Sequence, residues 1–189
     1  MEITRTLDPK TRSAWRQWLE QNHAKEKEIW LLFRPSAPGT ITYLDVVEEA
    51  LCFGWIDGIA KRHGDATAQR ITPRRPRSNW TELNKHRARR LIAMGKMTEP
   101  GRRTLPDLSD EGVRVPDDVR ESLQAEPDAW QAFLRFPELY QRVRLGYIEE
   151  MRKRDPREWQ KRLDHFVAKT AQNKMFGNWD DASLLRTEE

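Results

Sequence analysis

The feature that most constrains the chain is a dense block at residues 49–58, followed closely by a second block at residues 71–80. The first block ends an amphipathic helical pattern and places Asp57 among glycines. The second ends a strand-like run and brings arginines and Trp80 to the start of a helix. Together they supply charges of both signs and aromatic surface, which predicts a binding site without naming a reaction.

The length of 189 residues is sufficient for one domain, or for one domain with a helical extension. No apolar run is long enough to span a membrane, and the first residues lack the apolar segment of a secretory signal. The single cysteine, Cys52, excludes an internal disulfide and fits a reducing compartment. We therefore expect a cytoplasmic protein.

Local patterns predict an α+β start. Residues 9–22 have apolar side chains at helical spacing, and residues 28–34 form a short apolar run typical of a buried strand. After a loop at 35–39, Thr42 and Asp45 resemble a capping box, and Gly54 is placed to end the helix that they open. Strands at 55–60 and 68–72, joined by a turn, form a predicted hairpin.

The later part of the chain is predicted to be helical. Ser78 is a good N-cap for a basic helix over residues 79–94, and residues 104–116 are the best linker candidate. Beyond the linker, four prolines each fall near a helix start. The predicted fold is α+β: a sheet of about three strands packed by helices in residues 1–105, then an all-helical region over 115–189.

Positive charge is concentrated in one stretch. The net charge is +4, but residues 70–103 alone carry 11 basic and 2 acidic side chains. Such a stretch attracts phosphates, nucleic acid or acidic partners. The alternative is a solvated helix face that meets the acidic last third of the chain.

The preferred site is an anion site at Arg74, Arg75 and Ser78, since a helix N-terminus presents free N–H groups and a positive dipole. Arg77 adds a third guanidinium, and a bridge to the acidic tail is the structural alternative. Asp57 beside Arg70 or Arg74 would form a charge-assisted pair that orients a ligand, or a structural salt bridge. The remaining candidates that shape the pocket are Trp55, Trp80 and Asn84, although both tryptophans also suit a core.

A second interpretation is nucleic-acid binding by the basic helix, which needs basic side chains on one exposed face. The candidate residues are Lys85, Arg87, Arg89 and Arg90. No sequence typical of base readout accompanies them. A third interpretation is an enzyme on a small anionic substrate with Asp57 as acid or base, but no nucleophile or cofactor motif accompanies that carboxylate.

Cys52 falls inside an apolar helix, so we expect an inert buried thiol. The four histidines have no ligand spacing, and no phosphate-loop motif occurs, so no metal, cofactor or catalytic residue is predicted. The balance favours a binding or interaction protein over an enzyme.

Several of these clusters occur together in a known family. The chain resembles the YdeI/OmpD-associated family of bacterial proteins in residues 50–58, 72–75, 78–81 with Asn84, and 95–97 with Gly101. This resemblance covers residues 7–101. The second half is similar more loosely, at residues 115–118, at Ala129 with Phe133, at 147–148 and at 153–154 with Arg157. It departs where the family has Gly-x-Trp, because Val113 and Arg114 follow Gly112, and where Pro156 precedes Arg157.

The resemblance implies a bacteriocin-protection or stress-type interaction protein, and it implies no catalytic residues. The expected partner is an anionic small molecule or an acidic protein surface, with nucleic acid as the alternative.

Overall fold

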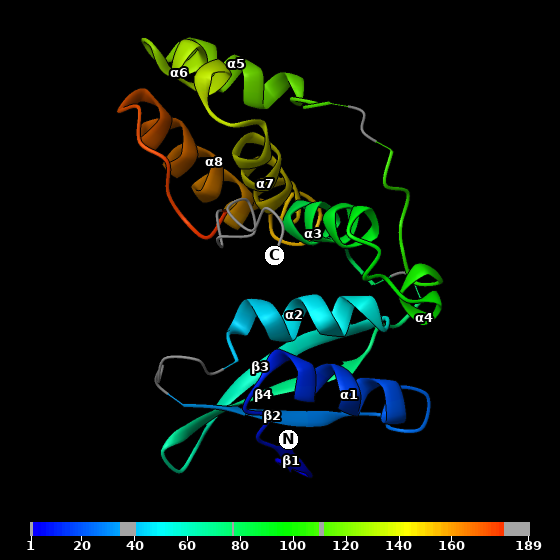
Figure 1. Cartoon of the computed structure of the whole chain (residues 1–189). Helices are drawn as coiled ribbons and strands as arrows, with labels where there is room; N and C mark the ends of the chain where they lie inside the picture. The colour runs from blue at the N-terminus through cyan, green and yellow to red at the C-terminus, as the bar shows by residue number, and fades with distance from the viewer. Residues whose placement is uncertain (1, 35–40, 77, 110–111, 180–189) are drawn as a thin grey trace. The chain divides into compact units, whose positions relative to one another are not determined.

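The computed structural model of the chain describes residues 2–34, 41–76, 78–109 and 112–179. Contacts divide the chain into two compact units. The first comprises Met1–Asn79 with Arg87–Leu108, and the second comprises Trp80–His86 with Ser109–Glu189 (Figure 1). The predicted division into domains at 1–105 and 115–189 stays a prediction. The predicted loop at 35–39 and the side chain of Arg77 lie outside the described residues.

The first unit contains a four-stranded sheet of order β1-β2-β4-β3. Its strands are β1 (Thr6–Leu7), β2 (Ile29–Phe33), β3 (Trp55–His63) and β4 (Ala66–Pro73). The α+β prediction is confirmed, but the sheet has one strand more than predicted. The missed strand is β1, which has two residues and pairs in parallel with β2, so it has no alternating pattern to read.

β3 and β4 form the predicted hairpin, with longer strands than expected. The register shifts between Asp57 and Ala60, where β3 carries one residue more than the facing part of β4. The Gln69 side chain donates to the carbonyl of Gly58 at 2.6 Å within this bulge. The bulge changes which β4 residue lies opposite each position of β3, and this determines the surroundings of Asp57.

Two helices cover one face of the sheet, α1 (Arg12–Asn22) and α2 (Tyr43–Cys52) (Figure 1). α1 begins three residues later than predicted, because the Thr11 hydroxyl accepts from the Ala14 N–H and caps the helix. The capping box of Thr42 and Asp45 on α2 is confirmed. Gly54 follows the helix with φ of 73°, the left-handed conformation that glycine adopts freely.

The core between these helices and the sheet is aromatic. Trp15, Trp30 and Trp55 are fully buried, as are Leu19, Ile29 and Ile71. Trp18, which is partly exposed, stacks on Trp15 at 5.3 Å between ring centres and meets Trp55 edge-on at 5.9 Å. Trp55 therefore belongs to the core, the structural alternative given above for this residue.

A buried ionic cluster ties α1 to α2. Arg12 donates to Glu49 at 2.6 Å, to Glu48 at 2.7 Å and to Asp45 at 3.3 Å. Arg90 also pairs with Glu48, whose side chain has no exposed surface. Burial of a carboxylate is tolerated only when charged partners surround it, so these arginines hold the helices together.

Two further helices follow, α3 (Glu82–Ala93) and α4 (Glu99–Arg102). The predicted start of α3 at residue 79 with Ser78 as N-cap is wrong. Thr81 caps the helix instead, since its hydroxyl accepts from the Asn84 N–H at 3.2 Å. α3 runs from the second unit into the first. Residues 105–109 and 112–115 contain no helix or strand, as predicted for the linker.

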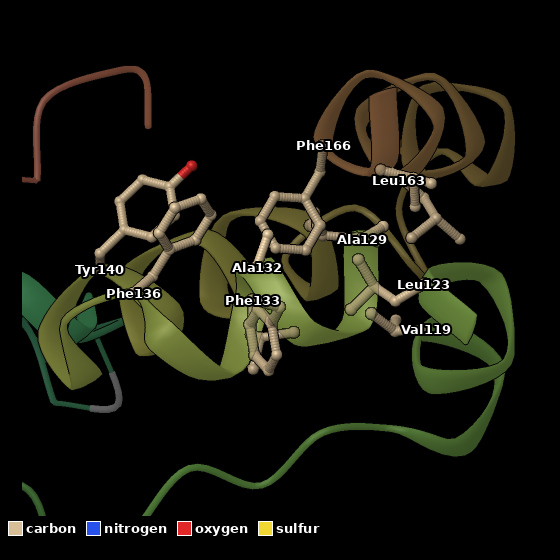
Figure 2. Packing of buried hydrophobic residues seen from close by; sticks show 12 residues of the cluster. Val119, Leu123, Ala129, Ala132, Phe133, Phe136, Tyr140, Leu163 and Phe166 are labelled. Atoms are coloured by element: carbon tan, nitrogen blue, oxygen red, sulfur yellow. The ribbon is translucent and has the colours of Figure 1, made fainter. Parts of the chain in front are cut away.

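The rest of the second unit is helical: α5 (Asp117–Ala125), α6 (Ala129–Arg135), α7 (Glu138–Glu149) and α8 (Pro156–Ala171). Each helix starts at or just after one of the four prolines, which confirms the prediction that these prolines lie near helix starts. Its core gathers Val119, Leu123, Phe133 and Phe166 from α5, α6 and α8, with Tyr140 and Phe136 beside them (Figure 2). No helix of the described residues is long and apolar enough to cross a membrane.

The segment after α8 packs back onto α7. Tyr140 meets Phe176 edge-on at 6.5 Å and Trp179 edge-on at 5.5 Å between ring centres. These contacts place the end of the described chain beside the first turn of α7.

Candidate functional site

Asp57 is hydrogen-bonded to a residue that the sequence did not single out. The Tyr43 hydroxyl, at the start of α2, donates to Asp57 Oδ2 at 2.5 Å. Loss of water contact and the neighbouring carboxylate both raise the pKa of Tyr43. A phenol whose pKa is raised stays protonated, so the Tyr43 hydroxyl remains the donor of this hydrogen bond.

The expected pair of Asp57 with Arg70 is not formed. Asp57 lies opposite Ile71, and neighbouring residues of a strand point to opposite faces, so Arg70 points away from it. Arg70 pairs instead with Glu28, at 2.7 Å from its Nε. Glu28 is thereby held between Arg70 and the Thr4 hydroxyl, which donates at 2.5 Å.

Arg74 lies near Asp57, but it is buried. Its Nη1 donates to the carbonyl of Asn79 at 2.9 Å. Burial lowers the pKa of Arg74 to about 10, although Asp57 acts in the opposite direction. Arg75 is exposed and makes a turn in which its carbonyl accepts from the Ser78 N–H at 3.1 Å. Since the helix begins at Glu82, Ser78 contributes no helix N-terminus to an anion site.

The basic helix does not present Arg87 and Arg90 on an exposed face. Arg87 is 6% exposed, and burial lowers its pKa while Tyr43 and Asp57 raise it. Arg90 pairs with Glu48, and Arg89 donates from Nε to the carbonyl of Leu108 at 3.0 Å. The guanidinium groups of Arg89 and Arg90 therefore bind acceptors that belong to the first unit.

The other predicted residues belong to the second unit. Trp80 and Asn84 are partly buried there, and Lys85 pairs with Glu82 at 2.6 Å one turn earlier on α3.

The second unit contains a pocket that the sequence did not reveal. Its volume is about 620 Å³, within the range of small-molecule sites. α7 supplies Arg144 and Tyr147, α8 supplies Lys161, Arg162 and His165, and Phe176 comes from the segment after α8. We refer to these residues, together with Glu158, Gly177 and Asn178, as the Arg144 pocket.

Arg144 is the distinctive group of this pocket. It is 7% exposed, and its Cζ lies 5.2 Å from the ring centre of Phe176 and 5.4 Å from that of Tyr147. Within the described residues, its Nε has no hydrogen-bond partner and no carboxylate pairs with it. Burial lowers the pKa of Arg144, and the two neighbouring tyrosines act in the opposite direction. Aromatic faces recover only part of the cost of burying a cation.

Arg162 has a different role, because its charge is already matched. It donates to Glu158 at 3.0 Å and to the carbonyl of Tyr147 at 2.7 Å, and its Cζ lies 3.7 Å from the Tyr147 ring centre. This residue therefore fixes the ring of Tyr147 against the wall of the pocket.

Two family models match the chain in separate stretches. A model described as a domain of unknown function, DUF8412, matches residues 7–104. The chain belongs to this family. A second model, described as Bacteriocin-protection, YdeI or OmpD-Associated, matches residues 113–173. The resemblance to the YdeI/OmpD-associated family is thereby confirmed, and the match lies in the helical half, where the motifs agree more loosely. Comparison with curated proteins and with solved structures gives no match.

The Arg144 pocket lies largely within the YdeI/OmpD-associated stretch. Arg144, Tyr147, Lys161 and His165 fall inside residues 113–173, and Phe176 follows directly. These residues carry little sequence signal, since Arg144 and Phe176 are far apart in the chain and follow no spacing rule. One available signal was the glycine at 177 in an otherwise polar and aromatic segment.

Proposed function

We propose that this chain is a binding protein of the YdeI/OmpD-associated type that holds an anionic group in the Arg144 pocket. The observation that carries the proposal is a buried guanidinium, lining an open pocket, that has no carboxylate partner among the described residues. A carboxylate or phosphate supplies what this group lacks, because its oxygens accept two parallel N–H donors in a planar geometry.

The surroundings of Arg144 favour an anion further. Lys161 and His165 are exposed at the pocket, and Lys161 has no ion-pair partner in the described part of the chain. Glu158, the acidic residue of the pocket, is engaged by Arg162. An approaching anion therefore meets uncompensated positive charge at the opening and a fixed guanidinium inside, which favours both association and retention.

This proposal keeps the chemistry predicted from the sequence and changes its location. A basic, aromatic-lined anion site was predicted at Arg74, Arg75 and Ser78, where the structure buries Arg74 and starts the helix later. Arg75 remains accessible, so the original assignment is a prediction that the same experiment can test.

The test is a titration with benzoate and phenyl phosphate, with phenol as the neutral ring control. The ¹⁵N signal of the Arg144 Nε–H group and the heat of binding are both followed. Arg144→Gln is expected to weaken anion binding at least about tenfold, since a charged hydrogen-bonded pair is lost. Arg135→Gln is the matched control, because Arg135 is an exposed arginine of the same unit that pairs with no carboxylate among the described residues.

The outcomes are distinct. Binding of both anions that survives in Arg135→Gln and in the double variant Arg74→Ala, Arg75→Ala, but is lost in Arg144→Gln, supports the proposal. Binding that is lost only in the double variant returns the site to Arg74 and Arg75. If no anion binds at concentrations up to about 10 mM, the proposed function is rejected, because a dissociation constant above that value is of little biological use.

Nucleic-acid binding by residues 79–94 and catalysis by Asp57 remain predictions. Neither gains a specific observation, because Arg87 and Arg90 are directed into the first unit and Asp57 accepts from Tyr43.

A further inference from the structure

We infer that the Arg144 pocket selects a phosphate monoester of a small organic molecule over singly charged anions. This inference rests on the proposed function, since it names the class of anion that the same pocket takes.

The first argument is charge. Three cationic side chains and one carboxylate line the pocket, Arg144, Lys161 and Arg162 against Glu158, which leaves a balance of +2 when His165 is neutral. Arg162 and Glu158 pair at 3.0 Å, so the two remaining charges belong to Arg144 and Lys161. A carboxylate neutralises one of them. A phosphate monoester carries between about −1.5 and −2 at neutral pH and neutralises both.

The second argument is the arrangement of the two cations. Arg144 lies within a ring environment formed by Tyr140, Tyr147 and Phe176, at 5.2 to 5.9 Å between its Cζ and the ring centres. Lys161 is exposed on α8. A monoester has three terminal oxygens, so it can meet the fixed fork of Arg144 and the flexible ammonium of Lys161 at once.

The third argument is size and lining. The volume of about 620 Å³ is larger than an inorganic oxyanion needs and falls among small-molecule sites. Phe176 meets His165 edge-on at 4.7 Å, and Tyr147 is 43% exposed. These rings offer apolar surface to an organic group attached to the phosphate, so free phosphate is expected to bind more weakly than its ester.

The experiment compares four probes that differ in the charge of the acid group or in the presence of an organic group: phenyl phosphate, its singly charged methyl diester, benzoate and inorganic phosphate. Affinities are measured by calorimetry at pH about 7.5, where the monoester is mostly doubly charged. We expect phenyl phosphate to bind about tenfold more tightly than the methyl diester or benzoate, the effect of one additional charge-assisted contact. The difference in affinity between phenyl phosphate and inorganic phosphate measures the contribution of the phenyl ring to binding.

Lys161→Gln separates this inference from the proposed function. The variant is expected to lose more affinity for phenyl phosphate than for benzoate, so its preference for phenyl phosphate falls to about twofold or less. Lys153→Gln is the matched control, since Lys153 is an exposed lysine outside the pocket. Its preference should remain at the wild-type value.

Two results overturn the inference. If all organic anions bind equally and all are lost in Arg144→Gln, the pocket is an anion site without preference for a monoester, and the proposed function stands. If the preference for phenyl phosphate over benzoate survives in Lys161→Gln, Lys161 does not pair with the second negative charge of the monoester. A failure of every probe rejects the proposed function as well.

Discussion

The guanidinium of Arg144 packs directly against the backbone of Gly177: a Cβ atom built on this glycine would lie 3.0 Å from Cζ and closer still to Nη1. Gly177 also has φ of 73°, a conformation that other residues adopt only at a cost. The position of a charge on α7 therefore depends on a missing side chain in the segment after α8.

Gly177→Ala is expected to displace Arg144 and to weaken anion binding about as much as Arg144→Gln does. Its effect on the free energy of unfolding should be modest, about 1–2 kcal/mol, because the added strain is confined to one residue. Calorimetric affinity and urea unfolding measure the two effects separately.

Gly112→Ala provides the control. Gly112 has φ of 70°, but a Cβ there would meet nothing within 4 Å. This variant carries the same kind of backbone strain without contacting Arg144, so its affinity should equal that of the wild type. Equal loss of binding in both variants would show that strain, and not the contact, is responsible.

Glu48 is the most deeply buried acid of the ionic cluster. Its Oε2 accepts from Arg12 at 2.7 Å, and Arg90 pairs with its other oxygen. Glu48→Gln leaves two arginines facing a neutral amide, and removal of one partner from a buried ion pair costs about 3–5 kcal/mol. We expect the midpoint of urea unfolding to fall accordingly.

The comparison is Glu99→Gln, which removes the partner of Arg103 where both side chains are mostly exposed. An exposed pair contributes about 0.5 kcal/mol or less, so the midpoint should hardly move. If the midpoint of urea unfolding falls as little in Glu48→Gln as in Glu99→Gln, the buried cluster gives the fold no net stabilisation.

The elements that could be predicted from the sequence carry their signals locally. Thr42 and Asp45 start α2 through contacts three residues apart, and Gly54 ends it by its own backbone conformation. The strands around Ile29 and Ile71 are short apolar runs. Pro156 occupies the first turn of α8, which its fixed φ suits, and the other three prolines of the second unit lie just before a helix, which they cannot extend in the N-terminal direction.

What could not be predicted depends on register and on long-range packing. Arg70 was expected beside Asp57, but a bulge between Asp57 and Ala60 sets the register, and no sequence signal gives its position. Arg144 and Phe176 meet only because the chain after α8 folds back onto α7. Periodicity describes the faces of one helix, so it does not report which distant segment covers that face.

Glu28 makes the first unit sensitive to acid. The hydrogen bond from Thr4 and the contact with Arg70 lower the pKa of Glu28 below its ordinary value of 4.5. The unfolded chain then binds more protons than the folded chain in acid, so the contribution is complete above pH 4.5 and is lost as the pH falls through the folded value.

Arg70→Met removes the cation that pairs with Glu28. The variant should be less stable than the wild type at neutral pH, and the difference should shrink as the pH falls below 4.5. Urea unfolding at several pH values measures this convergence. A difference that stays constant with pH would assign the effect of Arg70 to packing of its side chain.

Cys52 reports on the integrity of the first unit. Burial, together with the neighbouring Glu49, raises the pKa of this thiol to about 12, although Arg16 acts in the opposite direction. The thiolate is the reactive form, so the folded protein should react with a disulfide reagent at pH about 8 at least a hundredfold more slowly than the urea-unfolded chain. In Glu48→Gln the folded protein opens more often, and its reaction should accelerate about tenfold for each 1.4 kcal/mol of lost stability. A fast reaction of the folded wild type would contradict this account, because it would require Cys52 to be accessible while α1 and α2 remain packed.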